Sequence, residues 1–425
     1  MAPGVARSWL PATVLLLAVL HSAAAAAAGV ESGAVAALLE FKRALRDVDG
    51  RLSTWNAAAD NPCRWAGVAC SAGGEVTGVT LHGLNLHGGL SAAVCALPRL
   101  AVLNVSGNTL SGAVPPGLAA CAALQIPDAV GNLVALEELD IHSNNLTGRI
   151  PVSMRSLQRL RVIRAGINDL SGRIPVELTE CASLELLGLD QNRLVGTLPR
   201  ELARLKNLTS LILWQNAFSG EIPPELSNCT NLQMLALNDN AFTGSVPREL
   251  AALPSLLELY IYRNQLDGTI LPELGNLQSV LEIDLSENKL TGIIPGELGR
   301  IPTLRLLYLF DNRLQGSIPP ELGQLSGIRQ IDLSINNLTG TIPKAFQNLS
   351  SLDFLELFDN QLHGDIPPLL GANCNLWVLD LSENQLTGSI PAHLCNNQNL
   401  ILLSLGSNRL SGNIPPGLKA CTTLT

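Results

Sequence analysis

The sequence predicts an α/β repeat solenoid, curved into a horseshoe or superhelix, in which short parallel strands form one concave sheet. Three observations support this prediction. Asparagine recurs every 24 residues, twelve times from Asn144 to Asn408. The pattern LxxLxLxxN precedes each of these asparagines, as in LEELDIHSN, and a variant of xLxGxIPxxL follows each one. A repeat of this length is one structural unit, which buries its leucines by stacking on its neighbours.

Each part of the repeat has a physical role. In LxLxx the alternating leucines point to one face, so each repeat contributes a short strand with one buried side. The asparagine closes that strand, and its carboxamide can bond main-chain groups that the turn leaves unpaired. The glycine four residues later permits a backbone geometry that a Cβ would oppose. Ile-Pro then gives an extended segment with one backbone hydrogen-bond donor fewer, because proline has no N–H. In one repeat Leu271 replaces the proline.

The beginning of the chain indicates a secretory signal peptide at residues 1–28. Arg7 supplies a positive charge, residues 9–20 form a short apolar run, and the alanines at 23–28 offer small-residue cleavage sites. A membrane anchor is the alternative, but it would need ~20 apolar residues to span a bilayer. We therefore expect an exported, extracellular protein without a membrane span.

Composition argues against a nucleic-acid partner. Charged residues make up 15% of the chain, the formal net charge is −9, and no cluster of Lys and Arg is present. Since binding to phosphates depends on clustered positive charge, a neutral or basic ligand suits this surface better.

Nine cysteines in an exported chain raise the question of disulfides. Cys63 and Cys70, in NPCRWAGVAC, form a convincing local pair. Four others fall at a repeat position where other repeats carry a core leucine: Cys121, Cys181, Cys229 and Cys421. Residues two repeats apart are separated by ~10 Å, which is too far for a disulfide. We predict that these four are buried free thiols and that no cysteine pair closes the C-terminal end.

The repeat with LxGxIP resembles the plant-specific leucine-rich repeat over residues 76–425. The segment ahead of it, ALLEFKRAL at 37–45 followed by Trp55-Asn56 and the cysteine pair, resembles the N-terminal cap of plant receptor-like kinases, which places a cap at 29–75. The resemblance implies the ectodomain of a plant leucine-rich-repeat receptor-like serine/threonine kinase. It further implies a secreted peptide or protein ligand on the concave face, a leucine-rich-repeat co-receptor kinase, and the outer face of the plasma membrane for the full-length relative.

The residues of the cap agree with this resemblance. Leu38, Phe41 and Leu45 share one face of a helix, which could cover the open edge of the first strand. Trp55 and Trp65 are then expected in the core of the cap, not at a ligand site.

The ladder of asparagines has one irregular junction near 125–126. Asn108 is followed by Asn144 after 36 residues instead of 24. CAALQ at 121–125 begins a repeat, whereas Ile126-Pro127 belongs to the middle of a later one, so the ladder must slip or loop out. The sequence stops at Thr425, at the same position within the repeat as the junction at 125–126, and before any C-terminal cap or kinase. We interpret both features as the edges of a shortened splice form or gene model, and we expect a frayed C-terminal end.

No catalytic motif is found, and no enzyme activity, metal site or cofactor is expected. The kinase motifs HRD and DFG, the phosphate loop GxGxxG, and GxSxG and HExxH do not occur. Five carboxylates share the position just before the asparagine: Asp239, Glu287, Asp311, Asp359 and Glu383. Neighbouring members could form an acid/base pair, but a solvated rim at the strand ends is the favoured interpretation.

Aromatic residues give the more informative signal. Eight are predicted to face away from the core: Trp214, Tyr260, Tyr262, Tyr308, Phe310, Phe354, Phe358 and Trp377. Six of these are predicted to bind ligand, namely Trp214, Tyr260, Tyr262, Tyr308, Phe310 and Phe358. Four of the six lie two residues before the asparagine in every second repeat, over a span of ~29 Å at ~4.8 Å per strand. An extended peptide of about nine residues covers that length. Exposed aromatic rows normally mark interaction surfaces, although β-propensity on an open sheet is the alternative.

Six sequons predict N-glycosylation: Asn104, Asn145, Asn207, Asn228, Asn337 and Asn348. Of these, Asn104 is expected on the strand face, where a glycan would obstruct a ligand. The leading function is therefore ligand recognition by a receptor ectodomain. The alternative is a secreted enzyme inhibitor, similar to the polygalacturonase-inhibiting proteins, or a soluble decoy.

Overall fold

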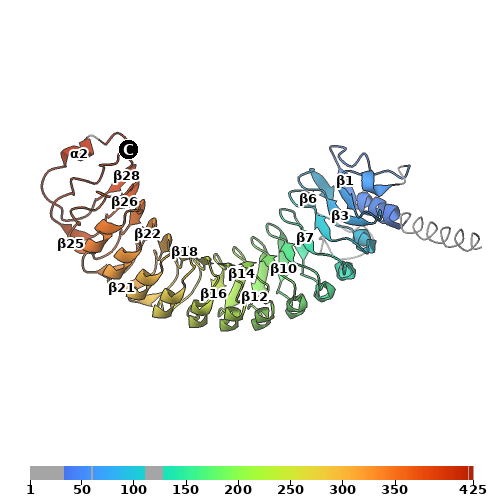
Figure 1. Cartoon of the computed structure of the whole chain (residues 1–425), viewed down its shortest axis with the longest axis horizontal. Coiled ribbons are helices and arrows are strands. Elements are labelled where there is room, and N and C mark those ends of the chain that lie inside the picture. The colour runs from blue at the N-terminus through green and yellow to red at the C-terminus, as the bar shows by residue number, and fades with distance from the viewer. Residues whose placement is uncertain (1–32, 59–60, 111–127, 420, 425) are drawn as a thin grey trace, which may run out of the picture.

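The computed structural model of the protein describes residues 33–58, 61–110, 128–419 and 421–424. The expected signal peptide, Cys121 and the junction at 125–126 lie outside these residues. The chain forms a curved arc, with the strands of one long sheet on its inner side and short helices on its outer side (Figure 1). Among the described residues, no helix is long and apolar enough to cross a membrane.

One sheet runs through the whole arc. Its strands are parallel from β3 onward, in sequence order, and each comes from a new repeat. The fifteen strands of this sheet in the described part of the chain are β2 (Val68–Cys70), β3 (Val76–Thr80), β5 (Val102–Asn104), β7 (Glu138–Asp140), β9 (Val162–Arg164), β11 (Leu186–Gly188), β13 (Ser210–Ile212), β15 (Met234–Ala236), β17 (Glu258–Tyr260), β18 (Glu282–Asp284), β20 (Leu306–Tyr308), β22 (Gln330–Asp332), β24 (Phe354–Glu356), β26 (Val378–Asp380) and β28 (Leu402–Ser404).

Smaller sheets line one flank of the arc. Their strands are β1 (Leu45–Asp47), β4 (Leu86–Gly88), β6 (Thr109–Leu110), β8 (Thr147–Gly148), β10 (Asp169–Gly172), β12 (Arg193–Gly196), β14 (Ala217–Gly220), β16 (Ala241–Phe242), β19 (Thr291–Gly292), β21 (Arg313–Ser317), β23 (Asn337–Thr339), β25 (His363–Asp365) and β27 (Gln385–Thr387).

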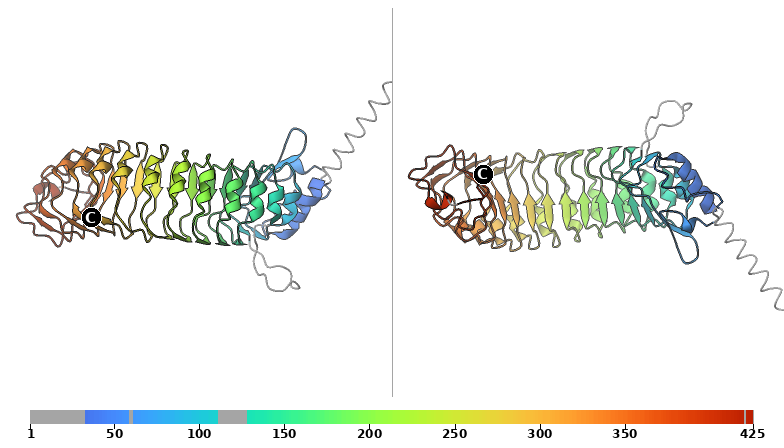
Figure 2. Two further views of the ribbon diagram at one scale, coloured as in Figure 1. Left: turned by 90° about the horizontal axis from the view of Figure 1, so that it is seen from below. Right: turned by 90° about the horizontal axis from the view of Figure 1, so that it is seen from above.

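Most repeats up to residue 348 return along the outer side through a short 3-10 helix, and Figure 2 shows these helices from below and the long sheet from above. The 3-10 helices are η1 (Pro62–Arg64), η2 (Ala92–Ala96), η3 (Asp128–Asn132), η4 (Val152–Ser156), η5 (Val176–Glu180), η6 (Arg200–Arg204), η7 (Pro224–Asn228), η8 (Arg248–Ala252), η9 (Pro272–Asn276), η10 (Gly296–Arg300), η11 (Pro320–Gln324) and η12 (Lys344–Asn348). The α-helices are a segment at 33–44 and α2 (Pro416–Lys419).

The repeated asparagine joins each repeat to the one before it. Asn312 is typical: its Nδ2 donates to the carbonyl oxygens of Leu309 at 3.1 Å and Phe310 at 3.2 Å in its own repeat. The same nitrogen donates to Leu285 O at 3.1 Å in the preceding repeat, and Oδ1 accepts from Leu290 N at 2.9 Å. This confirms the role expected of the asparagine and shows that its bonds also set the stacking of repeats.

The glycine of the repeat is confined by sterics, as expected. Gly388 has a φ of +73°, and a Cβ at this position would lie 2.5 Å from Asp365 Oδ1 in the preceding repeat. A side chain would therefore meet both backbone strain and a clash.

The N-terminal cap is built around two stacked indoles. Trp55 and Trp65 are buried, with ring centroids 5.5 Å apart, as expected for cap core. The predicted disulfide between Cys63 and Cys70 is present, with a Cα–Cα distance of 5.6 Å. One expectation was wrong: Leu45 is buried but lies in β1, because the helix ends at residue 44. The open edge of β3 is covered by antiparallel pairing with β2 and not by the helix.

The sheet keeps its register across the irregular junction. Strand β5 pairs directly with β7, with Leu103 opposite Leu139. Asn144 acts as the asparagine of the next repeat after Asn108. Its Nδ2 donates to Val105 O at 3.1 Å, and its Oδ1 accepts from Leu110 N at 3.1 Å. The repeats on the two sides of the junction are therefore paired directly in register, and the ladder does not slip.

The prediction that Cys421 is a free thiol was wrong. Cys421 forms a disulfide with Cys395, with a Cα–Cα distance of 5.9 Å. Cys395 lies in the neighbouring repeat and at a different position of that repeat. The prediction had compared only cysteines at the same position in repeats two apart, and that distance does not describe the Cys395–Cys421 pair. Cys181 and Cys229 are free and buried as predicted, and burial raises the pKa of Cys181 to about 11.

The Cys395–Cys421 disulfide is expected to hold the last described repeat in place. Replacing both residues by serine should destabilise α2 and its surroundings by ~2–4 kcal/mol, because the cross-link restricts the unfolded segment. Hydrogen exchange of peptides from 385–424 measures this change, with Cys229→Ala as a control that removes a buried thiol but no cross-link. Unchanged exchange in the double variant would contradict the prediction.

Candidate ligand-binding face

The concave face presents three outward side chains per repeat. In the repeat that ends at Asn264, these are Glu258, Tyr260 and Tyr262, while the intervening Leu259 is fully buried. We call the residues six, four and two places before each asparagine the first, second and third outward positions. Because the parallel strands pair in register, equivalent positions form columns along the arc.

All six predicted aromatic residues lie on this face and are half-buried. We call them the aromatic strip. Tyr260 and Tyr308 occupy the second outward position, and the other four occupy the third: Trp214, Tyr262, Phe310 and Phe358. Their placement agrees with the prediction, whereas their role in binding is not tested by geometry alone.

Ring contacts extend the strip beyond the predicted residues. Tyr308 contacts Phe310 and Phe354, with centroids 6.1 Å apart in each pair, and Phe354 contacts Trp377 at 5.7 Å. These four rings form a continuous cluster from β20 to β26. Phe354 and Trp377 were not predicted as ligand-binding residues, because they lie outside the column with the clearest alternation. The available signal was the first outward position of Phe354, and for Trp377 its place directly before β26.

Two phenols of the strip are fixed by neighbouring strands. The hydroxyl of Tyr260 donates to Glu282, and that of Tyr308 donates to Gln330. Burial, together with nearby carboxylates, raises the pKa of both tyrosines. Both rings therefore remain neutral and held in one orientation at physiological pH.

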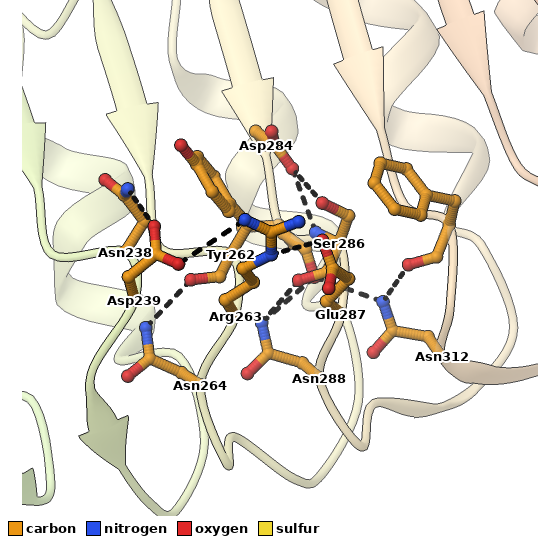
Figure 3. Close-up of polar contacts among 12 residues, drawn as sticks. Asn238, Asp239, Tyr262, Arg263, Asn264, Asp284, Ser286, Glu287, Asn288 and Asn312 are labelled. Carbon is orange, nitrogen blue, oxygen red and sulfur yellow. Dashed lines mark hydrogen bonds and ion pairs between the residues drawn. The ribbon is translucent and has the colours of Figure 1, made fainter. Parts of the chain in front are cut away.

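A column of carboxylates lies beside the rings. Its members occupy the second outward position in the C-terminal half of the arc: Asp284, Asp332, Glu356 and Asp380. We call this set the acidic column. Asp284 Oδ1 accepts from the amide of Ser286 at 3.0 Å and from its hydroxyl at 2.6 Å (Figure 3), and the other two aspartates repeat this arrangement two and four repeats later.

The acidic column was missed by sequence reasoning. The motif Asp-x-Ser at 284–286, 332–334 and 380–382 alternates with the aromatic repeats, and this spacing was the signal that could have found it. Burial raises the pKa of Asp284 to about 6. Burial, followed by the charges of Asp332 and Asp380, raises the pKa of Glu356 to about 7.

The rim carboxylates behave differently from the acidic column. Arg263 lies between two of them, with 3.6 Å to Asp239 and 2.7 Å to Glu287 (Figure 3). The remaining three are exposed: Asp311, Asp359 and Glu383. This arrangement agrees with a solvated rim. Over the described residues, no group of His, Cys, Asp and Glu that could hold a metal ion is found.

The sequons fall into two groups. Five have exposed asparagines away from the outward positions: Asn145, Asn207, Asn228, Asn337 and Asn348. Asn104 lies at a second outward position, half-buried, where its Oδ1 accepts from Ser106 N at 3.0 Å and its Nδ2 donates to Asp140 at 3.2 Å.

Known protein families match along the chain. The leucine rich repeat N-terminal domain matches residues 32–71. Leucine rich repeat families match residues 206–266, 274–314, 316–362, 135–157, 375–397 and 399–421.

Curated relatives are similar to parts of the chain. A leucine-rich repeat receptor-like serine/threonine-protein kinase of Arabidopsis thaliana is 51% identical over 87 residues, which are 20% of this chain and 8% of that protein. Receptor-like protein kinase HSL1 of the same plant is 39% identical over 89 residues, or 21% of this chain and 9% of that protein. These alignments therefore span less than a tenth of either relative.

Solved structures extend the similarity to most of the chain. The Arabidopsis receptor kinase HAESA, crystallised with the peptide hormone IDA and the co-receptor SERK1, superposes with a TM-score of 0.82 at 34% identity, covering 92% of this chain and 64% of that chain. The plant peptide hormone receptor RGFR1, in complex with RGF2, gives a TM-score of 0.76 at 37% identity, covering 85% and 63%. The chain is thus a leucine-rich-repeat protein, homologous to the ectodomains of plant receptor kinases.

Proposed function

We propose that the chain is the extracellular ligand-recognition domain of a plant receptor-like kinase and binds a peptide along the concave face. The observation that carries this proposal is the aromatic strip, six half-buried rings on an uncovered parallel sheet. Rings that remain partly exposed in this way favour an interface, since aromatic residues dominate binding energy where they become fully buried. In this proposal the chain recognises its ligand and catalyses no reaction.

The similar structures support the proposal. HAESA and RGFR1 were each crystallised with a peptide hormone, and HAESA also with a co-receptor. By this similarity a leucine-rich-repeat co-receptor kinase is a proposed second partner. The proposal also includes a signal peptide at residues 1–28 and glycans on the five exposed sequons, all of which would leave the outward positions free for a ligand.

A secreted enzyme inhibitor is the second candidate function. The Cys395–Cys421 disulfide favours it, because the polygalacturonase-inhibiting proteins, which the sequence resembles in its repeat and cap, close with a C-terminal cysteine pair. Inhibition of a purified polygalacturonase by the secreted chain, without binding to any peptide, would support this candidate over the receptor.

The peptide-binding proposal is tested with the secreted chain and an array of synthetic peptides of about 8 to 14 residues. Affinities are then measured for the peptides that bind. Tyr262→Ala and Phe310→Ala should each weaken binding by ~2 kcal/mol, or ~30-fold, because each removes an anchoring ring.

Ile293→Ala is the matched control for these two variants. Ile293 is 62% exposed and follows β19, away from the outward positions, so its truncation should leave affinity unchanged. Wild-type affinity in both aromatic variants would show that the strip is not the binding surface.

A further inference from the structure

The acidic column has no internal cation. Some carboxylates of the face and rim are paired: Glu138 lies 2.9 Å from Arg164, and Glu287 lies 2.7 Å from Arg263. In the part of the chain that the structure describes, Asp284, Asp332, Glu356 and Asp380 form no ion pair. These four carboxylates therefore differ from Glu138 and Glu287.

Unpaired carboxylates in this position have a free-energy cost. Asp284 and Asp332 are 9% and 6% exposed, so each has lost most of its hydration. The bonds from Ser286 and Ser334 satisfy one oxygen of each carboxylate but bring no positive charge. A buried charge is disfavoured unless an opposite charge compensates it. A cation supplied from outside would provide that compensation.

A further polar atom near the ring cluster lacks a partner. Asp353 is 6% exposed and directly precedes Phe354. Its Oδ2 lies 2.6 Å from Arg329, whereas its Oδ1 is buried without a hydrogen-bond partner. Its charge reaches the face, because it contributes to the raised pKa of Tyr308. The rings from Tyr308 to Trp377 therefore lie near a carboxylate that is paired with Arg329 through one oxygen and has no hydrogen bond to the other.

The spacing of the column defines the ligand further. Asp284, Asp332 and Asp380 lie on every second strand, so neighbouring members are ~10 Å apart at ~4.8 Å per strand. A polyproline II segment has three residues per turn and rises ~3.1 Å per residue. Side chains three residues apart thus lie on one side at ~9 Å. This repeat matches the spacing of the aspartates.

The rings lie between the carboxylates. Phe310 lies two residues after β20, the strand between those of Asp284 and Asp332. Phe358 lies two residues after β24, which carries Glu356 and lies between the strands of Asp332 and Asp380. The face of an aromatic ring attracts Lys and Arg, and their aliphatic stems pack on apolar surface. A column of carboxylates beside a column with rings in every second repeat suits a series of basic side chains along the arc.

From this arrangement we propose that the face from β18 to β26 binds a basic peptide in polyproline II conformation, with Lys or Arg at every third residue seated on Asp284, Asp332 and Asp380. This inference rests on the proposed function, because it specifies the class of peptide that the concave face takes. Phe310 and Phe358 then separate successive basic side chains and stack against their stems.

Four synthetic twelve-residue peptides on one proline-rich scaffold test the inference. One carries arginine at positions 3, 6 and 9, the second at 3, 5 and 7, the third carries glutamate at 3, 6 and 9, and the fourth is neutral. The first should bind the wild-type chain at least tenfold more tightly than any of the others. Equal affinity for the first and second peptides would overturn the proposed spacing.

The triple variant Asp284→Asn, Asp332→Asn and Asp380→Asn removes the charges but keeps the fold. Asparagine accepts the same bonds from serine, as Asn104 does from Ser106 at the equivalent position. Binding of the arginine peptide should fall at least 100-fold. The single variant Asp332→Asn should reduce it about tenfold, and this measurement decides the question if the triple variant fails to fold.

A matched control removes three charges from the outer side with the same periodicity. Glu225, Glu273 and Glu321 lie in η7, η9 and η11, and their replacement by glutamine should leave affinity unchanged. An equal loss in this control would show that net charge alone attracts the peptide and would overturn the inference.

The test separates the inference from the proposed function. If the array yields peptides whose binding depends on Tyr262 and Phe310 but which show no enrichment in basic residues, the inference fails and the proposed function stands. If no peptide of any composition binds, both fail.

Discussion

Replacing Asn312 by alanine should lower the free energy of unfolding of its region by about 4 kcal/mol, the largest loss that we expect from a single polar side chain. Its carboxamide makes four hydrogen bonds, two within its repeat and two to the preceding one. Alanine would leave the amide of Leu290 and the carbonyl of Leu285 buried and unpaired, and each such group carries a desolvation penalty of ~1–3 kcal/mol. The loss should spread to neighbouring repeats, because stability in a solenoid depends on the interfaces between them.

Hydrogen exchange followed by mass spectrometry measures this effect repeat by repeat. Faster exchange is expected in residues 285–335, on both sides of the substitution. Asn276→Ala is the matched control, since Asn276 is exposed at the end of η9 and no side-chain bond ties it to another repeat. A loss limited to the turn at Asn312 would show that the asparagine serves its own repeat alone.

The sequence predicted the features that depend on local order in the chain. The period of 24 residues placed the strands, the asparagine rungs and the outward positions, because each follows from the alternation of buried and exposed residues within one repeat. The cap disulfide Cys63–Cys70 was predictable for the same reason, since only six residues separate the two cysteines.

Other features depend on which residues become neighbours across repeats. The pairing of Cys395 with Cys421 joins two different positions of adjacent repeats, which a comparison of equivalent positions cannot detect. The acidic column was not predicted from the sequence, because the second outward position does not hold a carboxylate in every repeat. In the N-terminal half of the arc it also holds Arg164, Gly188, Ile212 and Ala236. Its lack of internal cations became visible only when the arginines were placed in space.

The two halves of the concave face therefore have different chemistry on one scaffold. Between β7 and β9, Glu138 is paired with Arg164, whereas Asp140 on β7 has no ion pair among the described residues. From β18 onward the acidic column is buried or half-buried without cations from the described part of the chain, and rings occupy the neighbouring outward position in every second repeat. Such a face is less favourable for the isolated protein than a neutral one, so its charges are best explained by a partner that neutralises them.

The affinity for the arginine peptide should rise ~100-fold between pH 5.0 and pH 7.5, because each pKa unit of coupling is worth a factor of ten. In the free protein the pKa of Asp284 is raised to about 6 and that of Glu356 to about 7, chiefly by burial. Both carboxyls are therefore largely protonated at pH 5.0. A bound cation favours their ionised form and lowers both pKa values, so binding releases protons and strengthens as pH rises through this window.

Other ionisable groups around the acidic column influence the pH dependence of peptide binding. The charged and titratable groups that surround the column on β17 to β26 and on the rim are Glu258, Tyr260, Tyr262, Arg263, Glu282, Glu287, Tyr308, Asp311, Arg329, Asp353, Asp359 and Glu383. Burial also raises the pKa of Glu258 and of Asp332, so these two act in the same direction as Asp284. The tyrosines stay protonated throughout, because their pKa values are raised further above 10.

The stability of the free protein should follow the opposite trend, which distinguishes titration of the face from acid unfolding. Since the folded-state pKa values of Asp284 and Glu356 are raised, their contribution to stability is fully present at low pH and is lost as pH rises through about 6 to 7. Peptide titrations and thermal unfolding at half-unit steps of pH measure both trends on one sample. The triple asparagine variant should lose most of the pH dependence of binding, and the neutral peptide should show none. A wild-type affinity for the arginine peptide that is the same at pH 5.0 and pH 7.5 would mean that the acidic column does not receive the basic side chains.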